Sequence, residues 1–212
     1  MMRALPLLLL LACSSDRTAP AADPKPSAPD QTAPAADQAA PAATPAAAAA
    51  DPAAASAPAV GGPAPEFSLP GSDGKTHSLA QLRGQRAVVL AWFPKAFTGG
   101  CTAECKSFSE GGDQLRQFDA DYFAVSTDPA DENKRFAESV GADYPILSDP
   151  TTEIARAYGV LKEDGKRANR WTFYIGKDGN ILHIDREVKP ASAAQDVASR
   201  LESLGIAKRP PT

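Results

Sequence analysis

The chain has 212 residues, of which 22 are Lys or Arg and 26 are Asp or Glu, so its formal net charge is −4. This balance argues against a protein that binds nucleic acid without sequence preference, because such proteins carry a basic surplus. No apolar run approaches the roughly 18–20 residues of a membrane-spanning helix, so the sequence does not predict a transmembrane protein.

The first residues have the pattern of an export signal. One Arg precedes a short apolar run at 4–12, which ends in a small residue and is followed by Cys13. Residues 10–13 resemble a bacterial lipobox, and the resemblance implies that a signal peptide at 1–12 is removed and that the Cys13 thiol is lipidated. In lipoproteins of two-membrane bacteria, a serine such as Ser14 permits sorting to the outer membrane. The alternative is a plain secretory signal.

A low-complexity segment rich in Ala and Pro extends from Cys13 to residue 62. Half of the 20 prolines lie in the first 62 residues, and all 15 glycines lie at Gly61 or later. The segment has almost no large apolar side chains, so it cannot bury enough surface to offset the entropy of ordering. We therefore expect residues 13–62 to form a disordered tether, with the N-terminal lipid as the only membrane contact of a domain held in the periplasm.

Residues 63–212 alternate between strand and helix patterns and predict a single domain. A continuous apolar run at 86–93 predicts a strand buried on both faces. Further strands are expected at 122–126, 146–147, 170–175 and 181–187, and helices at 101–118, 131–140, 151–158 and 191–204. The sequence Lys-Asp-Gly-Asn between the last two strands predicts a hairpin. This order predicts an α/β fold with a mixed central sheet flanked by helices.

Two cysteines follow the first buried strand. Cys101 and Cys105 lie at the start of a predicted helix, beyond the carboxyl end of the strand, where open α/β sheets place their sites. Unpaired N–H groups and the positive end of the helix dipole favour the thiolate there, which is the nucleophilic form. Thr98 lies three residues before Cys101 and could direct its hydroxyl toward the sulfur. The alternative for a buried cysteine is inert packing.

The segment 94–101 reads Pro-Lys-Ala-Phe-Thr-Gly-Gly-Cys. It resembles the Pro-x-x-x-Thr-x-x-Cys active-site motif of peroxiredoxins, most closely their bacterioferritin comigratory protein (PrxQ) branch. The resemblance continues through 64–67, which resembles the family's opening strand, and through 79–84, 148–150 and 170–173. It implies a thioredoxin-like fold and a peroxidase that reduces hydrogen peroxide or organic hydroperoxides without metal, haem or flavin. It also implies a thiol electron donor such as a thioredoxin-like protein. We expect a monomer.

The same resemblance assigns roles to individual residues. Cys101 would be the peroxidatic cysteine, which attacks the O–O bond as a thiolate. Thr98 would contact the thiolate and the bound peroxide, and Pro94 would shield the pocket from water. Arg170 would favour the thiolate and stabilise charge in the transition state, and Glu104 would orient this arginine. Such a set suits the chemistry, because a leaving oxygen develops negative charge that fixed donors and a guanidinium stabilise.

The sequence departs from that branch at two positions. Gly99 stands where the branch usually has proline, and Cys105 lies four residues after Cys101, whereas the resolving cysteine commonly lies five residues after it, where this chain has Lys106. Helical residues four apart have Cβ atoms ~5–6 Å apart, whereas a disulfide needs ~3.5–4.5 Å. We therefore predict that Cys105 is the resolving cysteine and that the first helical turn must unwind. The alternative is resolution by an external thiol.

Three other classes of protein compete with a peroxidase. A Sco-like copper protein would use the Cys-x-x-x-Cys spacing of Cys101 and Cys105, since two thiolates suit Cu(I), but it needs a histidine that the 169–172 segment lacks. A thiol-disulfide oxidoreductase usually has Cys-x-x-Cys, which is absent. A tether or adhesion module would leave Arg170 unexplained.

Overall fold

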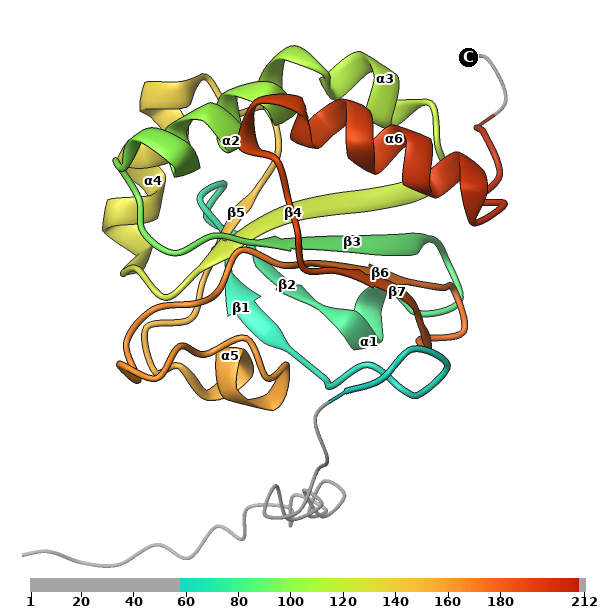
Figure 1. The fold of residues 1–212 in the computed structure, drawn as a ribbon, viewed down its shortest axis with the longest axis horizontal. Helices are drawn as coiled ribbons and strands as arrows, with labels where there is room; N and C mark the ends of the chain where they lie inside the picture. Colours follow the sequence, from blue (N-terminus) through green and yellow to red (C-terminus); the bar gives the residue numbers. More distant parts are fainter. Residues whose placement is uncertain (1–57, 210–212) are drawn as a thin grey trace, which may run out of the picture. The chain divides into compact units, whose positions relative to one another are not determined.

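The computed structural model describes residues 58–209 (Figure 1). The predictions for the signal peptide, for Cys13 and for most of the tether concern residues 1–57, which lie outside the described residues. Within 58–209, no helix is both long and apolar enough to cross a membrane.

A five-stranded mixed sheet forms the centre of the fold. Its strands are β3 (Ala87–Trp92), β4 (Ala120–Ser126), β5 (Ile146–Ser148), β6 (Thr172–Ile175) and β7 (Ile181–Asp185). They lie in the order β5-β4-β3-β6-β7, in which β5, β4 and β3 run parallel and β6 and β7 are antiparallel to their neighbours. The predicted hairpin between β6 and β7 is confirmed, because Gly179 takes the left-handed backbone (φ 84°) that a tight turn requires.

Helices cover both faces of this sheet (Figure 1). They are α1 (Leu79–Leu82), α2 (Gly99–Glu110), α3 (Gly112–Arg116), α4 (Ala130–Val140), α5 (Glu153–Ala157) and α6 (Ala193–Ser203), with a 3₁₀ turn η1 (Pro190–Ser192) before α6. The helices α2, α3, α4 and α6 lie on one face. On the other face lie α1, α5 and a two-stranded sheet of β1 (Ser68–Pro70) and β2 (Thr76–Ser78). The predicted α/β fold with a mixed sheet is confirmed.

The central strand β3 supplies residues to both halves of the core. All six of its residues are buried. Val89 and Ala91 pack in the cluster under α2, α4 and α6, whereas Val88, Leu90 and Trp92 pack in the cluster on the opposite face. A strand with helices on both faces has no solvent-facing side, so its sequence is continuously apolar.

Several predicted boundaries were wrong. The helix expected at 101–118 begins at Gly99 and is interrupted at Gly111, where a side chain would place its Cβ only 2.5 Å from the Cβ of Ala194 in α6. The opening strand expected at 64–67 is not a strand, and the antiparallel pair β1–β2 follows it instead. Strand β6 begins at Thr172, so Arg170 precedes the strand on which it was predicted.

Two residues at the end of the expected tether join the fold. The Gly61 N–H donates to Ile181 O (2.8 Å), and the Ile181 N–H donates to Gly62 O (2.9 Å). These bonds fix the chain against the edge strand β7 before residue 63.

Candidate active site

The site begins where the chain leaves the sheet after β3. The Phe93 N–H still donates to Val125 O (2.9 Å), and a loop over residues 94–98 then leads into α2. Cys101 is the third residue of that helix and is 1 % exposed. Its thiol therefore lies in the first helical turn, where the N–H groups have no helical acceptors.

Arg170 reaches Cys101 from the segment before β6. Its Nη2 donates a hydrogen bond to Cys101 Sγ at 3.3 Å. A Cβ built on Gly100 would lie 3.2 Å from the same nitrogen, so the glycine lets the guanidinium lie against the start of α2. The structure therefore brings together two residues that lie far apart in the sequence.

Glu104 completes a cluster with Cys101 and Arg170, which we call the Cys101–Arg170–Glu104 cluster. Its Oε2 forms an ion pair with Arg170 Nη1, so one guanidinium contacts both the carboxylate and the sulfur. Glu104 is 1 % exposed, and its Oε1 has no hydrogen-bond partner among the described residues. Burial raises the pKa of Glu104 to about 7, although the positive charge of Arg170 acts in the opposite direction.

Thr98 does not make the contact expected of it. Its hydroxyl donates to Lys95 O (2.9 Å) in the preceding loop, and no hydrogen bond joins it to the Cys101 sulfur in the described residues. Its exposed side chain also does not cap α2. The Thr98 hydroxyl, which the resemblance directs toward the sulfur, therefore donates to the Lys95 carbonyl of the loop instead.

Pro94 is half-buried directly after Phe93, at the start of the loop.

Cys105 lies on the buried side of α2. It is fully buried in the cluster between the sheet and the helices, and both Cys101 and Cys105 are free thiols. Burial, together with the nearby Glu104 carboxylate, raises the pKa of the Cys105 thiol well above its usual range. In this conformation Cys105 is therefore a poor nucleophile.

Sequence reasoning missed the residue that anchors the active-site loop. Asp128 follows the end of the neighbouring strand β4 and is 3 % exposed. It accepts hydrogen bonds from the Ala96 N–H (2.8 Å) and Ser126 Oγ (3.1 Å). It also forms an ion pair with Lys95, whose Nζ lies 2.8 Å from Glu132 Oε1. In the sequence, the acidic stretch 128–132 indicates only the usual preference for acidic residues at the start of a helix. A carboxylate directly after a parallel strand next to β3 is the signal that could have found it.

Phe97 is a second feature that the sequence did not suggest. Its backbone is left-handed (φ 59°), which is uncommon for a residue other than glycine. Its side chain is 54 % exposed and its ring packs 5.2 Å from that of Phe136. An apolar ring therefore lies at the surface next to Thr98.

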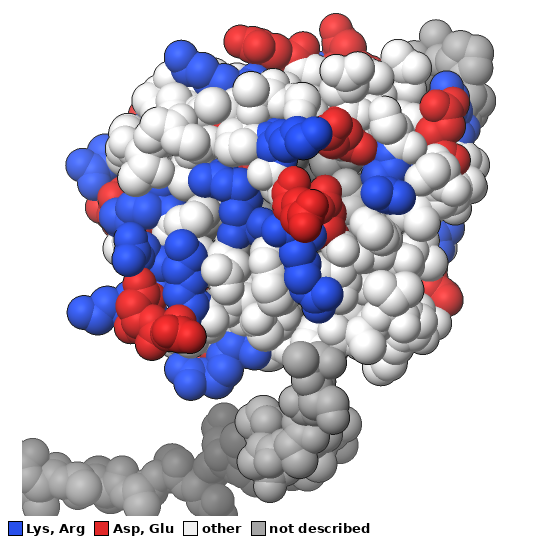
Figure 2. All heavy atoms as spheres, in the orientation of Figure 1, with Lys and Arg blue, Asp and Glu red and all other residues white. Residues whose placement is uncertain are grey.

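Figure 2 shows Lys and Arg side chains gathered, with some Asp and Glu among them, over the side of the molecule where Figure 1 places α4, α5 and the start of α2.

The copper interpretation needs a histidine near the two cysteines. His77 instead hydrogen-bonds Asp73 (3.1 Å) and packs on Phe123, and His183 packs on Tyr174. Across residues 58–209, no group of three or more His, Cys, Asp and Glu side chains is placed to hold a metal ion.

Comparison with known proteins identifies the class that this fold and site define. The model of the AhpC/TSA family matches residues 60–184, which is more than half of the chain. The chain belongs to the AhpC/TSA family, and it is a thiol-dependent peroxidase of the peroxiredoxin class.

Individual relatives agree with this assignment. Peroxiredoxin Bcp from Escherichia coli is 34 % identical over 133 residues, which cover 60 % of this chain and 85 % of the relative. The crystal structure of peroxidoxin BcpB from Mycobacterium tuberculosis is 31 % identical and superposes with a TM-score of 0.61 over 66 % of this chain and 94 % of that one. Bacterioferritin comigratory protein from Xanthomonas campestris is 27 % identical, with a TM-score of 0.59 over 65 % and 90 %. The predicted thioredoxin-like peroxiredoxin fold is therefore confirmed.

Proposed function

We propose that Cys101 is the peroxidatic cysteine and that Arg170 and Glu104 assist it. The hydrogen bond from Arg170 Nη2 to Cys101 Sγ is the single observation that carries this proposal. A guanidinium keeps its charge throughout the working pH range, so it can stabilise negative charge first on the sulfur and then on the leaving oxygen.

The first step is a displacement on the peroxide. The Cys101 thiolate attacks the outer oxygen of ROOH, a new S–O bond forms, and the O–O bond breaks. The RO⁻ group leaves, takes up a proton and departs as ROH, while Cys101 is oxidised to a sulfenic acid. Arg170 and the N–H groups at the start of α2 are preorganised donors for the oxygen on which charge develops. Rotation of Thr98 away from Lys95 O would add its hydroxyl as a contact to the bound peroxide, and Pro94 would limit the access of water.

The second step uses Cys105 as the resolving cysteine. Its sulfur attacks the sulfenic sulfur of Cys101, an S–S bond forms, and the hydroxyl leaves as water. Because the two cysteines are four residues apart on an intact helix, the start of α2 must unwind before the sulfur atoms can bond. The alternative that remains is attack by an external thiol.

The electron donor and the substrate follow from this chemistry. A dithiol protein of the thioredoxin type would return two electrons to the Cys101–Cys105 disulfide by thiol-disulfide exchange. The bacterioferritin comigratory protein of Xanthomonas campestris has alkyl peroxide reduction activity. Its likeness to this chain, together with the exposed Phe97 ring beside the loop, supports organic hydroperoxides as substrates besides hydrogen peroxide. The proposed unit is a monomer.

The proposed location is the bacterial cell envelope. Support comes from the sequence of residues 1–14: a short apolar run, a lipobox-like segment that ends in Cys13, and Ser14 after it. We propose that the Cys13 lipid anchors the chain in the outer membrane and that the peroxidase domain faces the periplasm.

Replacing Cys105 by serine tests the second step. With one equivalent of peroxide, Cys105→Ser is expected to accumulate the Cys101 sulfenic acid, because its resolving thiol is gone. Dimedone labelling of Cys101, measured by mass spectrometry, should rise well above that of the wild type. Cys101→Ser is the matched control and should show no labelling. Equal labelling of wild type and Cys105→Ser, with no intramolecular disulfide in the wild type, would show that an external thiol resolves the sulfenic acid.

A further inference from the structure

A tyrosine far from the motif holds the peptide group of Cys105. Tyr144 lies in the segment between α4 and β5, and its hydroxyl donates to Cys105 O at 2.9 Å. The hydroxyl of Ser109 donates to the same carbonyl at 3.1 Å. Tyr144 is 5 % exposed, and burial raises the pKa of its phenol, so the hydroxyl remains a donor.

Aromatic packing fixes the position of this hydroxyl. The ring of Tyr144 lies 5.2 Å from that of Tyr122 on β4 and 5.9 Å, edge to face, from that of Phe108 on α2. The three rings connect α2, β4 and the segment before β5. Because Phe108 and Cys105 are both on α2, the Tyr144 ring and its hydroxyl both stabilise the intact helix around Cys105.

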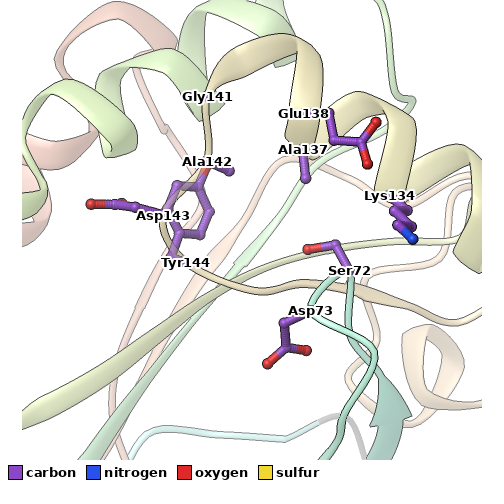
Figure 3. A pocket seen from close by; sticks show the side chains of 9 residues that line it. All are labelled: Ser72, Asp73, Lys134, Ala137, Glu138, Gly141, Ala142, Asp143 and Tyr144. Atoms are coloured by element: carbon purple, nitrogen blue, oxygen red, sulfur yellow. The ribbon is translucent and has the colours of Figure 1, made fainter.

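A pocket of about 240 Å³ lies beside Tyr144 (Figure 3). It is lined by residues of the β1–β2 turn, of α4 and of the segment that follows α4: Ser72, Asp73, Lys134, Ala137, Glu138, Gly141, Ala142, Asp143 and Tyr144. Figure 3 shows the Tyr144 ring on the side formed by the segment after α4. The Tyr144 ring therefore has open space on one side and the aromatic rings of Tyr122 and Phe108 on the other sides.

We propose that Tyr144 is a positioning residue that restrains Cys105 and thereby sets the rate of disulfide formation. This inference rests on the proposed role of Cys105 as resolving cysteine. In the intact α2 helix the Cys105 thiol is buried and protonated. It therefore reaches the Cys101 sulfenic acid only after the start of α2 unwinds. In this proposal Cys105 itself moves toward Cys101, and that movement breaks the hydrogen bond from Tyr144 to Cys105 O. A stronger hydrogen bond from Tyr144 slows disulfide formation and so lengthens the lifetime of the Cys101 sulfenic acid. Excess peroxide can then oxidise this sulfenic acid to sulfinic acid.

The test compares Tyr144→Phe with the wild-type protein. The substitution keeps the ring and removes the hydroxyl, and a hydrogen bond of ordinary net strength corresponds to a change in rate of about three- to tenfold. After one equivalent of peroxide, disulfide formation, followed by acid quench, alkylation and mass spectrometry, should be faster in Tyr144→Phe by this factor. The rate of Cys101 oxidation should not change, and less sulfinic acid should form at high peroxide.

Tyr122→Phe is the matched control. Tyr122 belongs to the same aromatic cluster, but its hydroxyl makes no hydrogen bond among the described residues, so its loss should leave disulfide formation at the wild-type rate. Hydrogen exchange of the α2 amides gives a second measurement and should be faster in Tyr144→Phe alone.

Two outcomes would overturn the inference in different ways. If the wild type forms the disulfide and Tyr144→Phe forms it at the same rate or more slowly, Tyr144 does not restrain Cys105, and the proposed function stands. If the wild type forms the sulfenic acid but no intramolecular disulfide, the resolving role of Cys105 fails, and the inference about Tyr144 fails with it.

Discussion

Replacing Arg170 by methionine is expected to slow the reaction of Cys101 with hydrogen peroxide by about 10²–10³-fold, the usual effect of removing one preorganised donor to developing charge. The physical reason is that the Arg170 guanidinium is the charged group that contacts the Cys101 sulfur, at 3.3 Å. Methionine replaces the aliphatic stem of the arginine side chain and carries no charge. Stopped-flow fluorescence of the reduced variant gives the rate constant.

The same substitution has a separate effect on stability, which a second variant isolates. Arg170→Met leaves the buried Glu104 carboxylate without its partner, a change that typically costs about 3–5 kcal/mol of unfolding free energy. Glu104→Gln in the Arg170→Met background removes that unpaired charge. The double variant should regain most of the stability but remain slow. A double variant that regains the wild-type rate would show that Arg170 acts only through the fold.

Glu104 is expected to make the stability of the protein depend on pH. Burial raises the pKa of Glu104 in the folded state to about 7 from an ordinary value of 4.5, so the fold favours the protonated carboxyl. The protonated form contributes stability that is fully present below pH 4.5 and is lost as the pH rises through about 7. Relative to Glu104→Gln, the unfolding free energy of the wild type should therefore fall by on the order of 3 kcal/mol as the pH rises through this interval.

Denaturant unfolding of both proteins at pH 4.5 and pH 8 measures this difference. Subtracting the Glu104→Gln values removes the contributions of the other titratable groups. A difference in unfolding free energy that stays constant between the two pH values would show that the Arg170 ion pair fully compensates the burial of the carboxylate.

The elements that the sequence predicted best are those whose signals are local. Strand β3 is continuously apolar because it is buried on both faces, and the turn between β6 and β7 contains Gly179 where the backbone is left-handed. The placement of Cys101 at the start of a helix after β3 also follows from local order. Each of these features depends on residues that are neighbours in the chain.

The features that the sequence did not predict depend on distant residues. Ala194 of α6 packs so closely against Gly111, between α2 and α3, that no side chain fits there, and nothing near Gly111 in the sequence indicates that contact. The active-site loop is anchored by Asp128, which is 32 residues from Ala96. The Tyr144 hydroxyl bonds Cys105 across 39 residues. Such polar contacts have no periodicity, so they become visible only in the structure.

Of the candidate site residues, the structure brings together Cys101, Arg170 and Glu104, and it places the Thr98 hydroxyl on a neighbouring carbonyl. The motif indicated which residue types to expect, but it contains no information on the rotamer of Thr98. Arg170, 69 residues from Cys101, was identified only through resemblance, since a single arginine before a strand has no distinctive local pattern.

The rate at which the reduced protein reacts with hydrogen peroxide tests the central claim most directly. Trp92 is buried at the end of β3, next to the active-site loop, so its fluorescence should report oxidation of Cys101 in a stopped-flow experiment. We predict a second-order rate constant at least about 10³-fold above that of free cysteine at the same pH, and loss of the signal in Cys101→Ser. A rate constant equal to that of an ordinary thiol would contradict the assignment of Cys101 as the peroxidatic cysteine.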